Sequence, residues 1–100
     1  MNKLQLEITK CAYTDIETIT DFIAKDNPES AIKFAKLFYK AFSTLCIHPN
    51  LGITRKDFTY LDVKFFVLKK NYLIVYRITD NNTLRILRVL TTYQDICAQL

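Results

Sequence analysis

The arginines of the segment YRITDNNTLRILRVL, residues 76–90, are the side chains of this sequence best suited to chemistry or binding. They lie in a run whose aromatic and β-branched residues are typical of buried strands. The core of a small domain has no place for Arg77, Arg85 and Arg88 on its inner face. Guanidinium groups bind phosphates and carboxylates well. The three arginines therefore indicate contacts with a nucleic acid, contacts with an acidic partner, or charges that keep a sheet in solution.

Strand alternation separates two of these arginines. Successive side chains of a strand point to opposite faces of the sheet. Arg85 falls with Leu87 and Val89, whereas Arg88 falls with Leu84, Ile86 and Leu90. The two guanidinium groups can share one surface only if a bulge interrupts the strand.

Other familiar site chemistries are not indicated by the sequence. His48 is the only histidine, and no nucleophile or carboxylate stands at a recognisable triad spacing from it. Gly52 is the only glycine, which argues against a glycine-rich phosphate loop. The three cysteines, Cys11, Cys46 and Cys97, are widely spaced, and we expect them to be small core residues rather than zinc ligands. No metal or cofactor is expected.

Composition limits the class of protein. One hundred residues, half of them hydrophobic, predict a single domain over residues 1–100 with one compact core. No apolar run reaches the ~18 residues of a membrane span, so we expect a cytoplasmic protein without a membrane partner. Residues 1–32 carry six acids and three bases, whereas residues 33–100 carry eleven bases and four acids. The basic second part favours a partner rich in phosphate or carboxylate.

Periodicity predicts the elements that position these residues. A half-buried strand is expected over 3–9, followed by a helix whose start is set by either Thr9 or the capping pattern at 14–17. Asn27 and Pro28 end that helix and begin a second one, which HPNLG closes. Three strands are expected over 60–69, 72–79 and 83–90, and a short helix or tail over 93–100. The fold class is α+β in the order β-α-α-β-β-β, with a helical hairpin packed on an antiparallel sheet.

The two predicted helices are amphipathic. The first has its apolar face at Ala12, Ile16, Ile19 and Ile23, widened by Phe22, with Asp15 among the polar residues opposite. The second carries an aromatic stripe that needs a sheet or a partner to cover it.

The ordered set of motifs resembles the ParE/RelE superfamily of bacterial toxins. The first helix matches its A-x-x-D-[IL]-x-x-I-x-x-[YF]-I pattern through Ala12, Asp15, Ile16, Ile19, Phe22 and Ile23, followed by Pro28 and Ala31. L-x-x-x-P-x-x-G follows as Leu45, Pro49 and Gly52. NYLIVYRI and LRILRVL resemble the family's hairpin through Tyr72, Tyr76, Arg77, Ile86, Arg88 and Val89. The resemblance spans about residues 3–92 and is closer to the ParE branch.

This resemblance implies the toxin of a type II toxin–antitoxin module, of the kind that stabilises plasmids. Such a toxin is neutralised by a small cognate antitoxin whose disordered or helical tail wraps it. ParE-like members poison DNA gyrase by protein binding, whereas RelE-like members are endoribonucleases that cut mRNA on the ribosome. A third possibility is a non-toxic antitoxin-binding partner with a degenerate site.

The residues favour the first of these. Lys64 matches one basic position of the ribonuclease branch, but Phe66 and Leu73 stand where that branch tends to place further bases. A non-catalytic toxin would use Arg77, Arg88, Tyr93, Ile96 and Leu100 to contact its target or its antitoxin. A ribonuclease would instead use Lys64, Arg88 and Tyr93. We therefore predict gyrase inhibition without catalysis, with ribosome-dependent cleavage as the alternative.

Overall fold

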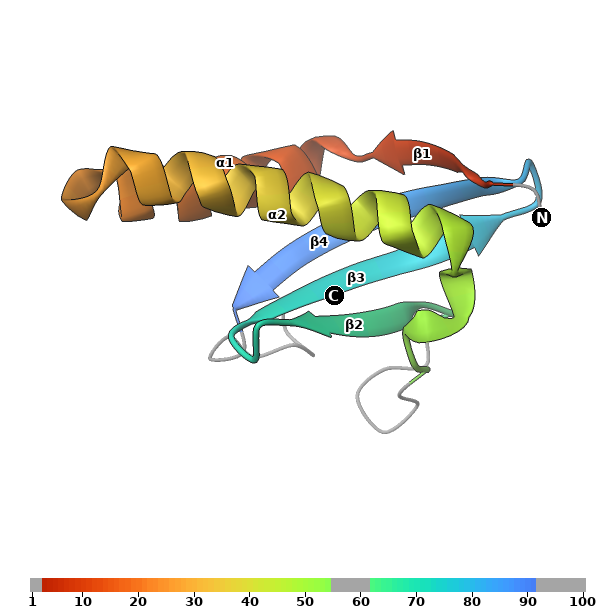
Figure 1. The fold of residues 1–100 in the computed structure, drawn as a ribbon. Helices are drawn as coiled ribbons and strands as arrows, with labels where there is room; N and C mark the ends of the chain where they lie inside the picture. The colour runs from red at the N-terminus through yellow and green to blue at the C-terminus, as the bar shows by residue number, and fades with distance from the viewer. Residues whose placement is uncertain (1–2, 55–61, 92–100) are drawn as a thin grey trace.

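The computed structural model describes residues 3–54 and 62–91, and its element order is the predicted β-α-α-β-β-β. Strand β1 (Gln5–Ile8) is followed by helices α1 (Lys10–Asp26) and α2 (Pro28–Ile47) and a short 3-10 turn, η1 (Pro49–Leu51). Strands β2 (Lys64–Leu68), β3 (Tyr72–Thr79) and β4 (Thr83–Thr91) complete the fold (Figure 1). The helix or tail predicted over 93–100 lies outside the described residues.

Both helices begin at residues that cap them. The hydroxyl of Thr9 accepts a hydrogen bond from the Ala12 amide at 3.3 Å, so α1 starts at Lys10 and not at the alternative capping pattern. The side chain of Asn27 accepts one from the Ser30 amide at 3.2 Å, and Pro28 occupies the first turn of α2. One residue therefore separates the helices, which run side by side as a hairpin over one face of the sheet (Figure 1).

The sheet is mixed rather than wholly antiparallel. Its strand order is β1-β4-β3-β2, and the β2–β3 and β3–β4 pairs are antiparallel, as predicted. Strand β1 joins the edge of β4 in the parallel direction, because the helical hairpin and β2–β3 lie between them in the chain. The second strand begins at Lys64 and ends at Leu68, so it is shorter than the predicted 60–69, of which 60–61 lie outside the described residues.

A one-residue bulge interrupts β4 at Leu87. Val75 pairs with Arg88 and Tyr76 pairs with Ile86, so Leu87 has no partner on β3. The extra residue shifts the alternation: Leu84, Ile86 and Val89 all belong to the core under the helices. Consequently the backbone register of Arg88, which pairs with Val75, matches that of Arg85. The two guanidinium groups still do not share one surface, because Arg88 reaches Asp15 of α1, whereas Arg85 pairs with Glu7 of β1.

The main core lies between the helices and the sheet. Phe38, Phe42 and Leu45 of α2 pack with Ile74, Tyr76 and Ile86 of the sheet, all fully buried. A second apolar cluster, Val63, Phe65, Leu73, Val75 and Leu90, lies on the opposite face. Cys46 is buried as predicted, but the prediction for Cys11 is wrong, because its side chain is exposed at the first turn of α1. Cys97 lies outside the described residues.

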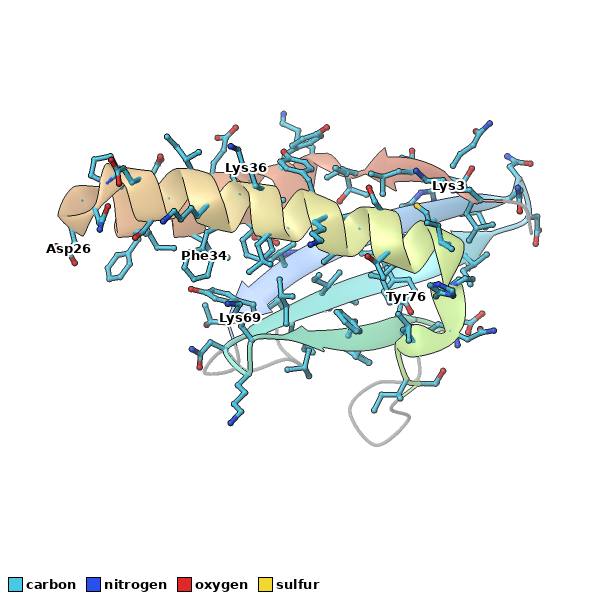
Figure 2. All side chains as sticks on the ribbon, viewed as in Figure 1. Lys3, Asp26, Phe34, Lys36, Lys69 and Tyr76 are labelled. Carbon is cyan, nitrogen blue, oxygen red and sulfur yellow. The ribbon has the colours of Figure 1, made fainter. Side chains whose placement is uncertain are left out.

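A buried tyrosine fastens the segment after α2 to the sheet. The Tyr76 hydroxyl donates a hydrogen bond to the Pro49 carbonyl at 2.7 Å and accepts one from the Gly52 amide at 2.9 Å. Burial raises the pKa of this phenol, although the Gly52 amide favours its ionised form. Figure 2 shows Tyr76 near the end of α2. The arrangement explains why glycine stands at position 52, because a Cβ atom there would collide with the Tyr76 side chain.

We expect Tyr76→Phe to lower the free energy of unfolding by about 2 kcal/mol, because it leaves the Gly52 amide and the Pro49 carbonyl without a partner. Urea unfolding followed by circular dichroism measures this loss. Tyr39→Phe is the matched control, since the Tyr39 side chain is 41% exposed and its hydroxyl has ready access to water. Equal stability of the two variants would contradict this role of Tyr76.

Candidate functional site

The guanidinium of Arg88 is held by a carboxylate of the first helix. Arg88 Nε and Nη2 donate to the two carboxylate oxygens of Asp15 at 2.7 Å and 2.9 Å, and the Val89 amide donates to the same carboxylate at 3.0 Å. The side chains are 24% and 15% exposed, respectively. The hydrogen bond to Asp15 raises the pKa of Arg88, whereas partial burial opposes this. Asp15 therefore neutralises the charge of Arg88. By accepting from the Val89 amide, it also satisfies a backbone donor at the edge of β4, beyond the point where β1 ends.

The helical pattern placed Asp15 on the side of α1 opposite its apolar face, and that prediction is wrong. Asp15 lies three residues after Ala12 and four before Ile19, and so on the helix face that contacts β4. Neighbouring Thr9 completes this junction: its hydroxyl lies 2.8 Å from the Ile86 carbonyl oxygen and 3.1 Å from that of Leu87. A carboxylate at an apolar-stripe position is the sequence signal that could have identified Asp15 as the partner of a buried charge.

The face of the sheet opposite the helices carries a row of charges across three strands. Glu7 pairs with Arg85 in the β1–β4 register, and Arg85 pairs with Arg77 in the β4–β3 register. Arg85 forms an ion pair with Glu7, with 38% and 49% of the two side chains exposed. The cross-strand neighbour of Arg77 is therefore another cation. The two like charges repel each other unless a further anion binds beside them.

Arg77 is the exposed cation of this row. Among the described residues it has no carboxylate partner, in contrast to Arg85 and Arg88. The strand positions it beside the buried second cluster, two residues after Val75. Of the three arginines that the sequence singled out, Arg77 is thus the one whose charge no described carboxylate matches.

Lys64 and Arg88 are not brought together. Lys64 pairs with Tyr76, whose side chain lies in the core under the helices, so strand alternation directs Lys64 to the helix side of the sheet. Arg88 pairs with Val75 of the opposite face and lies two strands away from β2. The third member of the ribonuclease set, Tyr93, lies outside the described residues, as do Ile96 and Leu100.

Two further features bear on the class of protein. Over residues 3–54 and 62–91, no group of three or more histidine, cysteine or carboxylate side chains is arranged to hold a metal ion. In the same part of the chain, neither helix has the length and apolar character that crossing a membrane requires.

Comparisons with known proteins agree on one family. The sequence profile of the ParE toxin of the type II toxin–antitoxin system parDE matches residues 6–96. The fold is similar to a chromosomal ParDE toxin–antitoxin system from P. aeruginosa, with a TM-score of 0.72 and 22% identity over 89% of this chain and 96% of that one. It is also similar to the RelBE2 toxin–antitoxin complex from Mycobacterium tuberculosis, with a TM-score of 0.59 and 21% identity over 94% and 97% of the chains. No curated protein matches the sequence.

Proposed function

Because the chain belongs to the ParE toxin family and is the toxin component of a type II toxin–antitoxin module, we propose that it inhibits DNA gyrase by protein binding, in the cytoplasm, until an antitoxin neutralises it. The observation that supports this proposal is the exposed Arg77 on the helix-free face of the sheet. Arg77 has no carboxylate partner among the described residues, and such a guanidinium is suited to an acidic side chain of another protein. The site needs no bound cofactor for such an activity.

The placement of Lys64 and Arg88 disfavours the ribonuclease alternative. Catalysis by charge stabilisation requires several donors directed at one developing negative charge. Here Lys64 lies on the helix side of the sheet, and the charge of Arg88 is already matched by Asp15. This arrangement supports binding over cleavage of mRNA on the ribosome. Tyr93, Ile96 and Leu100 remain predicted contact residues.

We expect Arg77→Glu to raise the concentration of toxin needed to inhibit gyrase at least tenfold, because it replaces a contact cation with an anion. Purified, antitoxin-free protein is mixed with bacterial gyrase, supercoiled plasmid and ATP, and the cleaved or unconverted DNA is measured. The variant should fold normally, since the introduced carboxylate would face Arg85 and relieve the repulsion between two arginines.

Lys36→Glu is the control, because Lys36 is exposed on the outer side of α2 (Figure 2) and the charge change is the same. Equal inhibition by the two variants would remove Arg77 from the gyrase contact. Absence of gyrase inhibition by the folded wild-type protein would overturn the target itself. Cleavage of mRNA in a translating extract would then indicate the ribosome, and harmless high-level expression would indicate the non-toxic partner.

A further inference from the structure

The closed end of the helical hairpin carries apolar side chains that the other described residues leave exposed. Figure 1 shows this end projecting beyond the ends of the strands. Phe22, which the sequence pattern placed on the buried face of α1, is 71% exposed, more than the other large apolar residues of the described chain. Burial of a phenylalanine is worth about 2 kcal/mol, so an exposed one marks a surface suited to a partner.

Two neighbouring hollows lie beside this hairpin, one lined by Tyr72 and the other by Phe34. The first, of about 360 Å³, has an apolar lining of Ile19, Phe22, Ile23 and Tyr72 with Thr18 and Thr91. The second, of about 340 Å³, lies between α2 and the β2–β3 turn and is lined by Ser30, Lys33, Phe34, Leu37 and Lys69. The rings of Phe34 and Tyr72 pack edge to face with their centroids 5.4 Å apart, so the two hollows lie on either side of this ring pair. An elongated segment that crosses the ring pair would reach both hollows.

The charges around the second hollow specify the chemistry of that segment. Lys33 and Lys69 line the hollow, and no acidic residue does so in the described part of the chain. Neither ammonium group forms an ion pair with a described residue. Figure 2 shows Phe34 on the side of α2 that faces the turn of Lys69. A carboxylate between the two lysines would be matched on both sides, beside an apolar wall.

The backbone of the turn is a second, independent indication. Lys69 and Lys70 have φ values of 53° and 65°, in the left-handed region. Asn and Gly are the residues preferred at two successive positions of this kind. Lysines there cost stability, and strained positions of this type cluster at functional sites.

We propose that these two hollows, the hairpin-end surface, are where the antitoxin docks, through an acidic amphipathic segment. Its apolar side chains fill the hollow at Phe22, and its carboxylates lie between Lys33 and Lys69. The inference rests on the toxin–antitoxin partnership. It places the antitoxin contact at the hairpin end of the sheet, where β3 begins at Tyr72, whereas the proposed gyrase contact, Arg77, lies toward the other end of β3.

The experiment measures the affinity of the toxin for its purified cognate antitoxin, labelled with a fluorophore. Phe22→Ser should weaken binding about thirtyfold, as for an aromatic anchor in a groove. Ile32→Ser is the matched control: Ile32 is 58% exposed on the same hairpin but lines neither hollow. Lys33→Glu should weaken binding about tenfold, whereas Lys36→Glu, one turn further along α2, should not.

The turn supplies a pair of variants that separates binding from stability. Lys69→Asn and Lys70→Asn both place a residue that tolerates positive φ at a strained position, so each should raise the Tm by a few degrees. Of these two turn lysines, only Lys69 lines the second hollow. Lys69→Asn should therefore weaken antitoxin binding about fivefold while stabilising the toxin, and Lys70→Asn should stabilise it with little change in affinity.

The binding measurements distinguish an incorrect docking surface from an incorrect antitoxin partnership. Tight binding by the wild-type toxin with equal affinities for Phe22→Ser and Ile32→Ser, and for Lys33→Glu and Lys36→Glu, would overturn the hairpin-end surface alone. No binding by the folded wild-type toxin would overturn the partnership and the surface with it. Full gyrase inhibition by Phe22→Ser is expected in either case, because Phe22 lies away from Arg77.

Discussion

Asp15→Ala should lower the free energy of unfolding by about 3 kcal/mol, a large part of the stability of a domain of this size. The substitution removes the carboxylate that accepts two hydrogen bonds from Arg88 and one from the Val89 amide. It removes the Asp15 counter-charge from a guanidinium that is only 24% exposed, and it leaves the Val89 amide at the edge of β4 without this acceptor. Urea unfolding of the wild type and the variant measures the difference.

A double-mutant cycle separates the ion pair from the strand-edge contact. Arg88→Met keeps the aliphatic stem and removes the charge, so the double variant Asp15→Ala/Arg88→Met lacks both charges of the ion pair. We expect a coupling energy of about 2 kcal/mol, with the remaining loss due to the unpaired Val89 amide. The Glu7–Arg85 pair is the control within the same sheet. Its side chains are more than a third exposed, so its coupling should fall below about 1 kcal/mol. Similar couplings for the two pairs would contradict a structural role of Asp15.

The result would also change how toxicity data on Arg88 are interpreted. Loss of toxicity in an Arg88 variant is expected from the loss of folded protein alone, whether or not Arg88 touches gyrase. Arg77 has no such internal contact among the described residues. A toxicity defect in Arg77→Glu with unchanged stability therefore identifies a contact, whereas the same defect in an Arg88 variant does not.

The helical hairpin could be predicted from the sequence because its signals are local. Asn27 and Pro28 fix the break through one capping side chain and one ring. The order of the strands follows from short turns, and Asn82, with φ of 58°, occupies the turn that was predicted to tolerate this conformation. Signals of this kind act within a few residues and can be read without knowledge of the rest of the chain.

The candidate site depends on contacts between distant residues, and the sequence did not indicate these. Asp15 and Arg88 are 73 positions apart, and neither position identifies its partner. The bulge at Leu87 changes the face of Arg88, but no glycine or other unusual residue marks it. Phe22 continues the apolar stripe of α1, and only the length of the hairpin relative to the strands leaves it exposed. The sequence identified the arginines as candidate contact residues. It did not show which of them form ion pairs within the protein.

Gly52→Ala should be the most destabilising small substitution, costing about 4 kcal/mol. A Cβ atom at Gly52 would lie 2.3 Å from the Tyr76 hydroxyl oxygen and 2.7 Å and 2.8 Å from two ring carbons. The tyrosine is fully buried and cannot withdraw without breaking its hydrogen bonds to Gly52 and Pro49. The expected cost is therefore overpacking together with two lost hydrogen bonds.

The backbone offers no competing explanation for that cost. Gly52 has φ of −76° and ψ of 160°, an extended conformation that alanine adopts freely. If alanine proved harmless, the contact with Tyr76 would not be as close as the structure shows. Combining Gly52→Ala with Tyr76→Phe tests the contact directly, because both changes break the same hydrogen bonds. The double variant should be more stable than the sum of the single losses predicts, by about 2 kcal/mol, yet less stable than Tyr76→Phe alone, since the ring carbons still meet the new methyl group.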